Sequence, residues 1–310
     1  MGILRARILA YVTNQLGNSV SVIDTRTNVE IARISVGAGP IGLALTPNQR
    51  RLYVGNSVGG TISIIDTVTN RVIPPLINFG STPSGMAITP DGTRLYVTNS
   101  NPTVNAVFVF DVNTNMQIQQ PIPVGLRPTS ITISSDGTRG YVGNTGDNTV
   151  SVLNLTTNSV IATIPVGTAP AVATLNPRLP RAYVTNTGDA NISVISTATN
   201  MVIPPPIPVG NVPIAAFFTS NGTRAYVTNS QSDNLSVINT ATNTEIFPRI
   251  DVGNGPFTLA FTPDGTRAYV TNSEENTVSI VNILTNTELP GRIPVGAFPS
   301  VIIIARVPNR

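Results

Sequence analysis

Five carboxylates recur at one place in a repeated sequence, and they are the side chains best suited to bind a ligand. Asp147, Asp189, Asp233, Glu274 and Glu275 each follow the tyrosine of a Tyr-Val-(Thr/Gly)-Asn motif by 5 to 7 residues. Carboxylate oxygens are good ligands for hard cations such as Ca²⁺, and they attract basic groups. We therefore take these five residues as candidate binding residues and calcium as a candidate ion.

The composition excludes several kinds of catalytic site. The chain of 310 residues contains no histidine and no cysteine, and its 18 basic residues are all arginine. It therefore has no Ser-His pair, no thiolate nucleophile and no imidazole or thiolate metal ligand. We predict no catalytic residue and no cofactor other than the candidate calcium, which oxygen atoms would have to bind.

Charge and hydropathy limit the partners that we expect. The formal net charge is +3, but the basic residues form no run and only 5% of the residues are aromatic, which argues against a nucleic-acid partner. No apolar run approaches the roughly 20 residues of a membrane span. The opening MGILRARILA lacks the uninterrupted apolar stretch of a signal peptide.

The motif that precedes the acids is repeated through the whole chain. Its tyrosines are separated by 42, 43, 45, 42, 43 and 43 residues, a Thr-Asn pair follows most of them by 16 residues, and a Gly-x-x-Pro sequence closes each unit. Such a period indicates a β-propeller or another repeat fold. The seven tyrosines are Tyr11, Tyr53, Tyr96, Tyr141, Tyr183, Tyr226 and Tyr269.

Each unit has the pattern of four antiparallel strands. Alternating apolar residues, β-branched residues and Asp-Gly turns fill the unit, and no segment has a helical period. The fourth strand of most units carries proline, as at 204–206, and proline is confined to edge strands because it cannot donate to a β-ladder. We therefore predict an all-β, seven-bladed β-propeller with the fourth strands on the outside.

The two ends of the chain complement each other in this scheme. The segment 299–306 resembles a first strand with no partner after it, while RILAYVTN is a second strand with no partner before it. We predict one domain over 1–310, closed by a blade that combines 299–306 with 5–38. The other blades are expected at 40–80, 83–125, 128–167, 170–210, 213–253 and 256–296. A linear solenoid is the alternative, but it would leave both ends unpaired.

The repeated phrases also resemble a known family. The YVTN motif, TPDGTR at 89–94 and 262–267, SVIDT at 21–25 and the Val-Gly closures are similar to the YVTN family of β-propeller repeats, found in surface-layer and other exported proteins. The resemblance covers essentially the whole chain. It implies a propeller, an extracellular or cell-surface location, and ligand binding at the face that carries the loops between strands two and three and between blades. It does not specify a function, since every motif element is a strand, a turn or a packing position.

Within YVTN, we expect the tyrosine and threonine to lie on opposite faces of the second strand, with the tyrosine packed between blades. We expect the asparagine to end the strand and to bond local backbone.

The acids lie only in the last four units, so they would occupy one sector of the loop face. Arginine precedes six of the seven tyrosines by two residues and would lie at the opposite face. This arrangement favours a cationic group, calcium or a basic partner surface at the acidic sector. The alternative is that both sets of charges only keep the surface soluble. Arg127, Phe257 and Phe298, in or beside the closures, could line the mouth of a pocket for a small anion or a sugar.

Three classes of function remain open from the sequence. The first is a non-catalytic binding or surface propeller that displays variable loops to a protein, small-molecule or glycan ligand. The second is a metal-assisted enzyme of lactonase or lyase type, because related propellers include both. The third is a structural scaffold that assembles through its faces. The absence of His and of an obvious inward acid favours the first.

Overall fold

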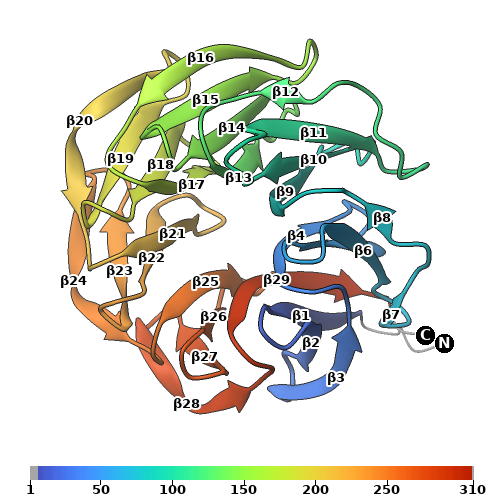
Figure 1. The fold of residues 1–310 in the computed structure, drawn as a ribbon. Helices are drawn as coiled ribbons and strands as arrows, with labels where there is room; N and C mark the ends of the chain where they lie inside the picture. Colours follow the sequence, from blue (N-terminus) through green and yellow to red (C-terminus); the bar gives the residue numbers. More distant parts are fainter. Residues whose placement is uncertain (1–5, 309–310) are drawn as a thin grey trace.

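The computed structural model describes residues 6–308, which form seven antiparallel sheets arranged as blades around a common axis (Figure 1). Each blade has four strands, and in one blade the outermost strand is split in two. This confirms the predicted seven-bladed propeller.

The four strands of a blade occupy equivalent positions from the axis outward. The first strands begin at the proline of the closure: β29 (Pro299–Val307), β4 (Pro40–Leu45), β9 (Pro83–Ile88), β13 (Pro128–Ile133), β17 (Pro170–Leu175), β21 (Pro213–Phe218) and β25 (Pro256–Phe261). The second strands begin at arginine and end at the motif asparagine: β1 (Arg7–Asn14), β5 (Arg51–Asn56), β10 (Arg94–Asn99), β14 (Arg139–Asn144), β18 (Arg181–Asn186), β22 (Arg224–Asn229) and β26 (Arg267–Asn272).

The third and fourth strands complete the blades. The third strands are β2 (Ser19–Asp24), β6 (Thr61–Asp66), β11 (Ala106–Asp111), β15 (Thr149–Asn154), β19 (Asn191–Ser196), β23 (Asn234–Asn239) and β27 (Thr277–Asn282). The fourth are β3 (Val29–Ser35), β7 (Arg71–Val72) with β8 (Ile77–Asn78), β12 (Ile122–Pro123), β16 (Ser159–Pro165), β20 (Met201–Pro208), β24 (Thr244–Asp251) and β28 (Thr287–Pro294). We number the blades 1 to 7, from β29-β1-β2-β3 to β25-β26-β27-β28.

Proline shapes the outer strands as expected. β20, β24 and β28 contain prolines and pair only with the third strand of their own blade. In blade 2 the segment between β7 and β8 contains Pro74 and Pro75, and the two short strands pair with β6 on either side of it.

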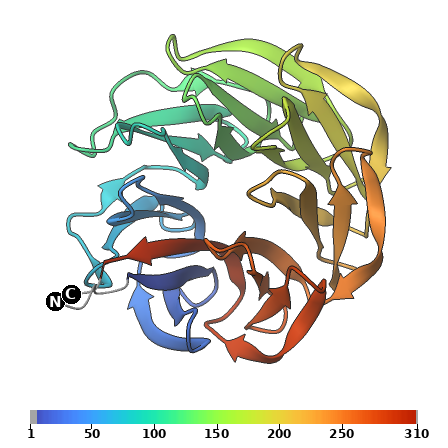
Figure 2. The same cartoon turned by 180° about the vertical axis from the view of Figure 1, so that it is seen from behind.

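The first and last parts of the chain close the ring. β1 pairs antiparallel with β29, from Arg7 opposite Val307 to Asn14 opposite Pro299. β29 also lies beside β25 of blade 7 and β4 of blade 2, as the view from behind shows (Figure 2). The predicted closure is thus confirmed, while the predicted start of this blade at residue 5 lies outside the described residues.

The motif tyrosines connect neighbouring blades. All seven are buried, and the hydroxyl of six donates to the side chain of the Thr-Asn asparagine in the next blade, for example Tyr11 to Asn70 at 2.8 Å. That asparagine has a left-handed backbone, with φ of 55° at Asn70. Tyr269 of blade 7 reaches Asn28 of blade 1 at 2.6 Å, so the ring closes with the same contact. The other pairs are Tyr53–Asn115, Tyr96–Asn158, Tyr183–Asn243 and Tyr226–Asn286.

The predicted face of the threonine of YVTN was wrong, whereas the asparagine ends the second strand as expected. Side chains of a strand alternate with a period of two, so tyrosine and threonine share one face; the Thr185 hydroxyl, like that of Tyr183, donates to the next blade, to the Ile214 carbonyl at 2.8 Å. In six blades the motif asparagine donates to side chains, whereas in blade 3 Asn99 Oδ1 accepts the local N–H of Asn101 at 3.0 Å, as expected. Asn144 Nδ2 donates to Thr149 Oγ1 at 3.0 Å and to Ser151 Oγ at 2.8 Å.

The buried tyrosines predict a sharp loss of stability at alkaline pH. Burial raises the pKa of Tyr183 to about 12 and also raises those of Tyr11, Tyr53, Tyr96, Tyr226 and Tyr269. In the unfolded chain a phenol ionises at a pH of about 10. Because the unfolded state loses these protons first, the stability present below a pH of about 10 is lost as the pH rises from there towards the folded pKa values.

During an alkaline titration, we expect the phenolate absorbance to increase and the far-ultraviolet circular dichroism signal to decrease over the same narrow pH range. Tyrosines that titrate near their ordinary pKa while the circular dichroism stays native would contradict this interpretation.

Candidate functional site

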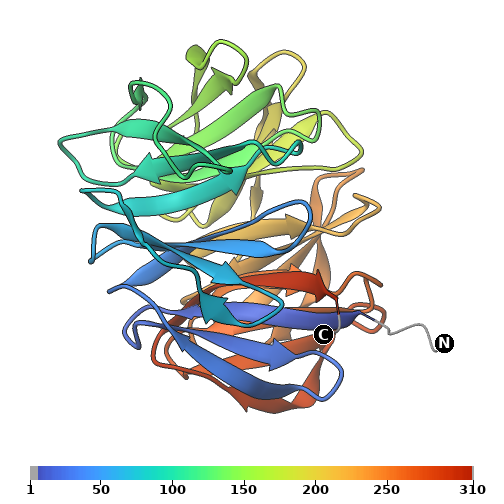
Figure 3. The ribbon, with the colours of Figure 1, turned by 90° about the vertical axis from the view of Figure 1, so that its right-hand side faces the viewer.

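The loop face carries the loops between second and third strands together with the closures between blades. Figure 3, which views the ring from its side, shows the strands running between this face and the opposite one. In each blade the two kinds of loop bond each other. In blade 4 the N–H of Thr145 donates to the Arg127 carbonyl at 3.2 Å, and that of Gly146 to the Leu126 carbonyl at 2.9 Å. The loops are therefore held against one another.

Three of the predicted carboxylates strengthen this contact within their own blades. Asp147 Oδ2 accepts the Leu126 N–H at 2.5 Å, Asp189 Oδ2 accepts the Thr168 N–H at 2.6 Å, and Glu275 Oε2 accepts the Asn254 N–H at 3.0 Å. In blade 6 the hydroxyl oxygen of Ser232 accepts the N–H of Asn211 at 2.9 Å. In blades 4 to 7 this position therefore supplies a side-chain acceptor to the closure, whereas blades 1 to 3 have Gly17, Gly59 and Pro102 there.

Asp233 and Glu274 behave differently. Asp233 Oδ1 accepts the N–H of Gly255 in the next closure at 2.9 Å, a contact that Asn148 and Asn276 make in other blades. Glu274 is exposed, and its carboxylate makes no hydrogen bond or ion pair to any residue of 6–308.

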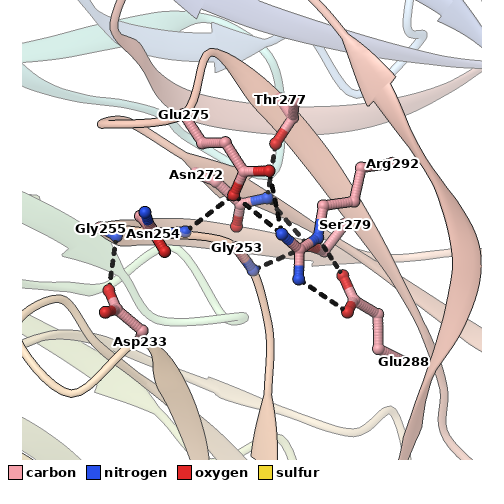
Figure 4. A network of polar contacts seen from close by, with 10 residues as sticks. All are labelled: Asp233, Gly253, Asn254, Gly255, Asn272, Glu275, Thr277, Ser279, Glu288 and Arg292. Carbon is pink, nitrogen blue, oxygen red and sulfur yellow. Dashed lines mark hydrogen bonds and ion pairs between the residues drawn. The ribbon is translucent and has the colours of Figure 1, made fainter.

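Blade 7 has an extended polar network on this face (Figure 4). Arg292 Nη1 donates to both oxygens of Glu275 at 2.9 Å, and its Nε donates to Glu288 Oε1 at 2.9 Å. The Arg292 guanidinium and the Asn254 N–H hold the pKa of Glu275 below its usual range. Because the ion pair is partly exposed, it contributes modestly to stability.

The five predicted acids are distributed over four blades. Asp147, Asp189 and Glu275 each bond the closure of a different blade, and Asp233 bonds the closure that follows its own. Between residues 6 and 308, no group of three or more Asp and Glu side chains lies together in a way that could hold a metal ion. Asp147, Asp189 and Asp233 lie on successive blades, and Asp233 and Glu275 bond neighbouring N–H groups of one closure, those of Gly255 and Asn254.

Arg127, Phe257 and Phe298, the residues of the predicted pocket mouth, lie at or beside the closures between blades. Arg127 and Phe298 have positive φ values of 51° and 55°, and their N–H groups donate to Asn105 and Asn276 at 3.0 and 2.8 Å. They turn the chain into blades 4 and 1. Phe257 is half-buried in β25, and its carbonyl accepts the Thr228 hydroxyl. Among residues 6–308, no hydrogen bond or cation–π contact joins Arg127 to either phenylalanine, and a shared pocket mouth stays a prediction.

Sequence reasoning missed an apolar part of the loop face. Leu16, Val58, Val104 and Leu126 lie on the loops of blades 1 to 4 and are 72%, 78%, 38% and 48% exposed. The acids lie on blades 4 to 7, so the loop face has an apolar half and an acidic half. The signal was present in the sequence, since Leu16 and Val58 occupy a loop position at which the later repeats have a polar residue or glycine.

The arginines that begin the second strands lie at the opposite face, as expected. Four of them donate to a carbonyl after the third strand of the next blade. Arg139 Nη1, for instance, donates to the Thr197 carbonyl at 2.6 Å. These arginines therefore contribute to the contact between blades as well as to the charge of this face.

The fold has several known relatives. A family model described as "Lactonase, 7-bladed beta-propeller" matches residues 24–164, which is less than half of the chain. No curated protein matches the sequence. Among the described residues, no helix is both long enough and apolar enough to span a membrane.

Solved structures match over most of the chain. Hydrazine synthase of Kuenenia stuttgartiensis is 21% identical, with a TM-score of 0.79 over 88% of this chain and 91% of that one. A functionally unknown protein from Desulfotomaculum acetoxidans DSM 771 is 17% identical, with a TM-score of 0.84 over 96% and 99%. Dihydro-heme d1 dehydrogenase NirN in complex with DHE is 16% identical, with a TM-score of 0.73 over 95% and 74%. At such identities the likeness establishes the fold alone.

Proposed function

We propose that this chain is a non-catalytic binding propeller whose loop face recognises a protein surface that combines basic and apolar side chains. The observation that carries the proposal is the division of this face into an apolar half on blades 1 to 4 and an acidic half on blades 4 to 7. The YVTN-like repeats favour a location at the cell surface or outside the cell.

Both halves are suited to recognition. Leucine and valine side chains project into solvent from loops that hydrogen bonds hold in place. They offer apolar area for binding, and little conformational entropy is lost because the loops are already ordered. Asp147, Asp189, Asp233 and Glu274 are exposed, and the arginines that this face shows within residues 6–308 are Arg127 and Arg292, of which Arg292 pairs with Glu275 and Glu288. A partner with Lys or Arg beside aliphatic residues would match this charge, which increases the association rate and the specificity.

A random-peptide display selection against the whole chain tests the proposal. We expect enriched peptides to combine Lys or Arg with aliphatic residues. Reversing the charge of three acids, in D147R/D189R/D233R, should weaken their binding by about tenfold or more, because attraction becomes repulsion. Isothermal titration of the enriched peptides measures the change.

A matched variant changes acids on the opposite face, in D91R/D136R, where both side chains lie in turns between first and second strands. This control should bind the peptides as the unchanged chain does. Enriched peptides that are acidic, or that bind the triple variant equally well, would overturn the proposal.

A lactone-hydrolysing enzyme is the second candidate, favoured by the family match over residues 24–164. The side chains of residues 6–308 do not fit a metal-assisted reaction, since they provide no grouped ligand set. Hydrolysis of γ- and δ-lactones in proportion to protein concentration, followed by pH-stat, would favour this candidate over the binding propeller.

A further inference from the structure

The face opposite the loop face contains a cleft between blades 7 and 1 that differs from the other blade junctions. Its volume is about 790 Å³, and four arginines line it, namely Arg7, Arg26, Arg267 and Arg306. Typical ligand sites have volumes of about 300 to 1,000 Å³. The cleft is therefore large enough for a small molecule.

Closure of the ring brings these arginines together. Arg267 begins β26, and Arg26 lies in the turn after β2. Arg7 and Arg306 come from the paired ends of β1 and β29, where Arg306 is opposite Ile8. β29 has 9 residues whereas the other first strands have 6, so only this junction gains an arginine from a longer first strand.

Arg26 is also an exception within the repeat. It occupies the third position of the five-residue segment that ends in the Thr-Asn asparagine, and it is the only charged residue at this position. The other six repeats have Val68, Asn113, Thr156, Ala198, Ala241 and Leu284 there. The turn forms in the other six repeats without a charged residue at this position. Arg26 is therefore not required by the backbone of the repeat, which indicates a role specific to this junction.

Arg267, like Arg224, lacks a contact that four of its counterparts make. At four other junctions the equivalent arginine donates to a carbonyl of the next blade. Arg267 lies close enough to Tyr269 to lower the pKa of its phenol against the larger effect of burial. In the part of the chain that the structure describes, its guanidinium donates to no carbonyl of blade 1.

The acids of the cleft do not neutralise the arginines. Asp24 Oδ1 accepts the Arg26 N–H at 2.8 Å, and Asp264 Oδ1 accepts the Thr262 hydroxyl at 2.5 Å and the Thr266 N–H at 3.1 Å. None of the four arginines forms an ion pair within residues 6–308. Four guanidinium groups against two carboxylates leave the cleft with a charge of +2.

We propose that this cleft binds a small oxyanion with at least two negative charges, such as a phosphate ester or a polycarboxylate. A guanidinium group donates two parallel hydrogen bonds to phosphate or carboxylate oxygens, and several guanidiniums around one cleft favour a multiply charged ligand. This site is independent of the loop-face proposal, because it lies on the other face and uses other residues.

Isothermal titration of the full chain with inorganic pyrophosphate and with citrate, at low salt, tests the site. We expect saturable binding of one anion per chain. The double variant R26Q/R306Q should weaken it by about tenfold or more, since two charge-assisted contacts are lost. Both arginines are exposed, so the variant should retain the thermal stability of the unchanged chain.

The matched control is R50Q/R178Q, which removes the same charge from exposed turns on the same face but outside this cleft. Its affinity for the anions should stay within about twofold of that of the unchanged chain. The two lost charges lie outside the cleft and should have only a weak long-range electrostatic effect. Binding of pyrophosphate alone, or of citrate alone, would support the site and identify its oxyanion. Absence of saturable binding by both, or equal weakening in the two double variants, would overturn the proposal.

Discussion

A chain that ends at residue 298 should fail to unfold cooperatively and should aggregate or expose its core. Removing residues 299–310 takes away β29, which pairs with β1 and lies between β25 and β4. Its side chains Ile302, Ala305 and Val307 are buried. The deletion would therefore open the ring and leave blade 1 without its first strand.

The expected loss is comparable to the total stability of a protein. Each large apolar side chain removed from the core costs about 1.5 to 3 kcal/mol of transfer free energy, and the net stability of a domain is about 5 to 15 kcal/mol. The deletion also leaves β1 with an unpaired edge, which promotes association between chains. Thermal unfolding followed by circular dichroism, together with sedimentation, measures both effects.

A circular permutant provides the control. A short linker from residue 308 to residue 6, with new ends between β13 and β14 in the exposed turn at 135–137, keeps every strand and moves the closure to blade 4. Because Val307 is already opposite Arg7, the linker needs only a tight turn. The permutant should unfold cooperatively near the temperature of the unchanged chain. A truncated chain that unfolds cooperatively, or a permutant that does not fold, would contradict the role given to this closure.

The success of the fold prediction has a physical reason. A sevenfold repetition with strand patterns and turns leaves few topologies, and the complementary ends distinguish a ring from a stack. The error on Thr185 came from the sequence reasoning itself, because a period of two already puts it on the face of Tyr183. The partners of Asn144 could not be read in this way, since Ser151 is seven residues away and meets it only through the register of β14 and β15.

Predicting the candidate site was harder for a different reason. The sequence placed Asp147 and Asp189 on the correct loops, but each carboxylate bonds a backbone N–H of the closure about 21 residues before it. Backbone donors have no signature in the sequence. Acids that accept hydrogen bonds from the backbone therefore cannot be distinguished, by sequence, from acids that are free to bind a ligand. The informative signals are departures from the repeat, such as Leu16 on one face and Arg26 on the other.

Replacing Tyr226 by alanine should lower the free energy of unfolding by about 3 to 5 kcal/mol, the usual cost of truncating a buried aromatic residue. The ring is fully buried between blades and packs edge-on against Phe261 at a centroid distance of 5.5 Å. The conservative change Y226F keeps the ring and removes only the hydroxyl, which donates to Asn286 at 2.6 Å. That variant should lose about 0.5 to 1.5 kcal/mol. Urea unfolding of both variants measures the two losses.

Asn286 allows the hydrogen bond between blades to be isolated. Its φ is 55°, which glycine adopts without strain, so N286G removes the acceptor and preserves the turn. If the repeated tyrosine and asparagine stabilise the ring through this contact, the double variant Y226F/N286G should lose less free energy than the sum of the single losses. Strict additivity, or a loss in Y226F as large as that in Y226A, would contradict this explanation of why both residues recur around the ring.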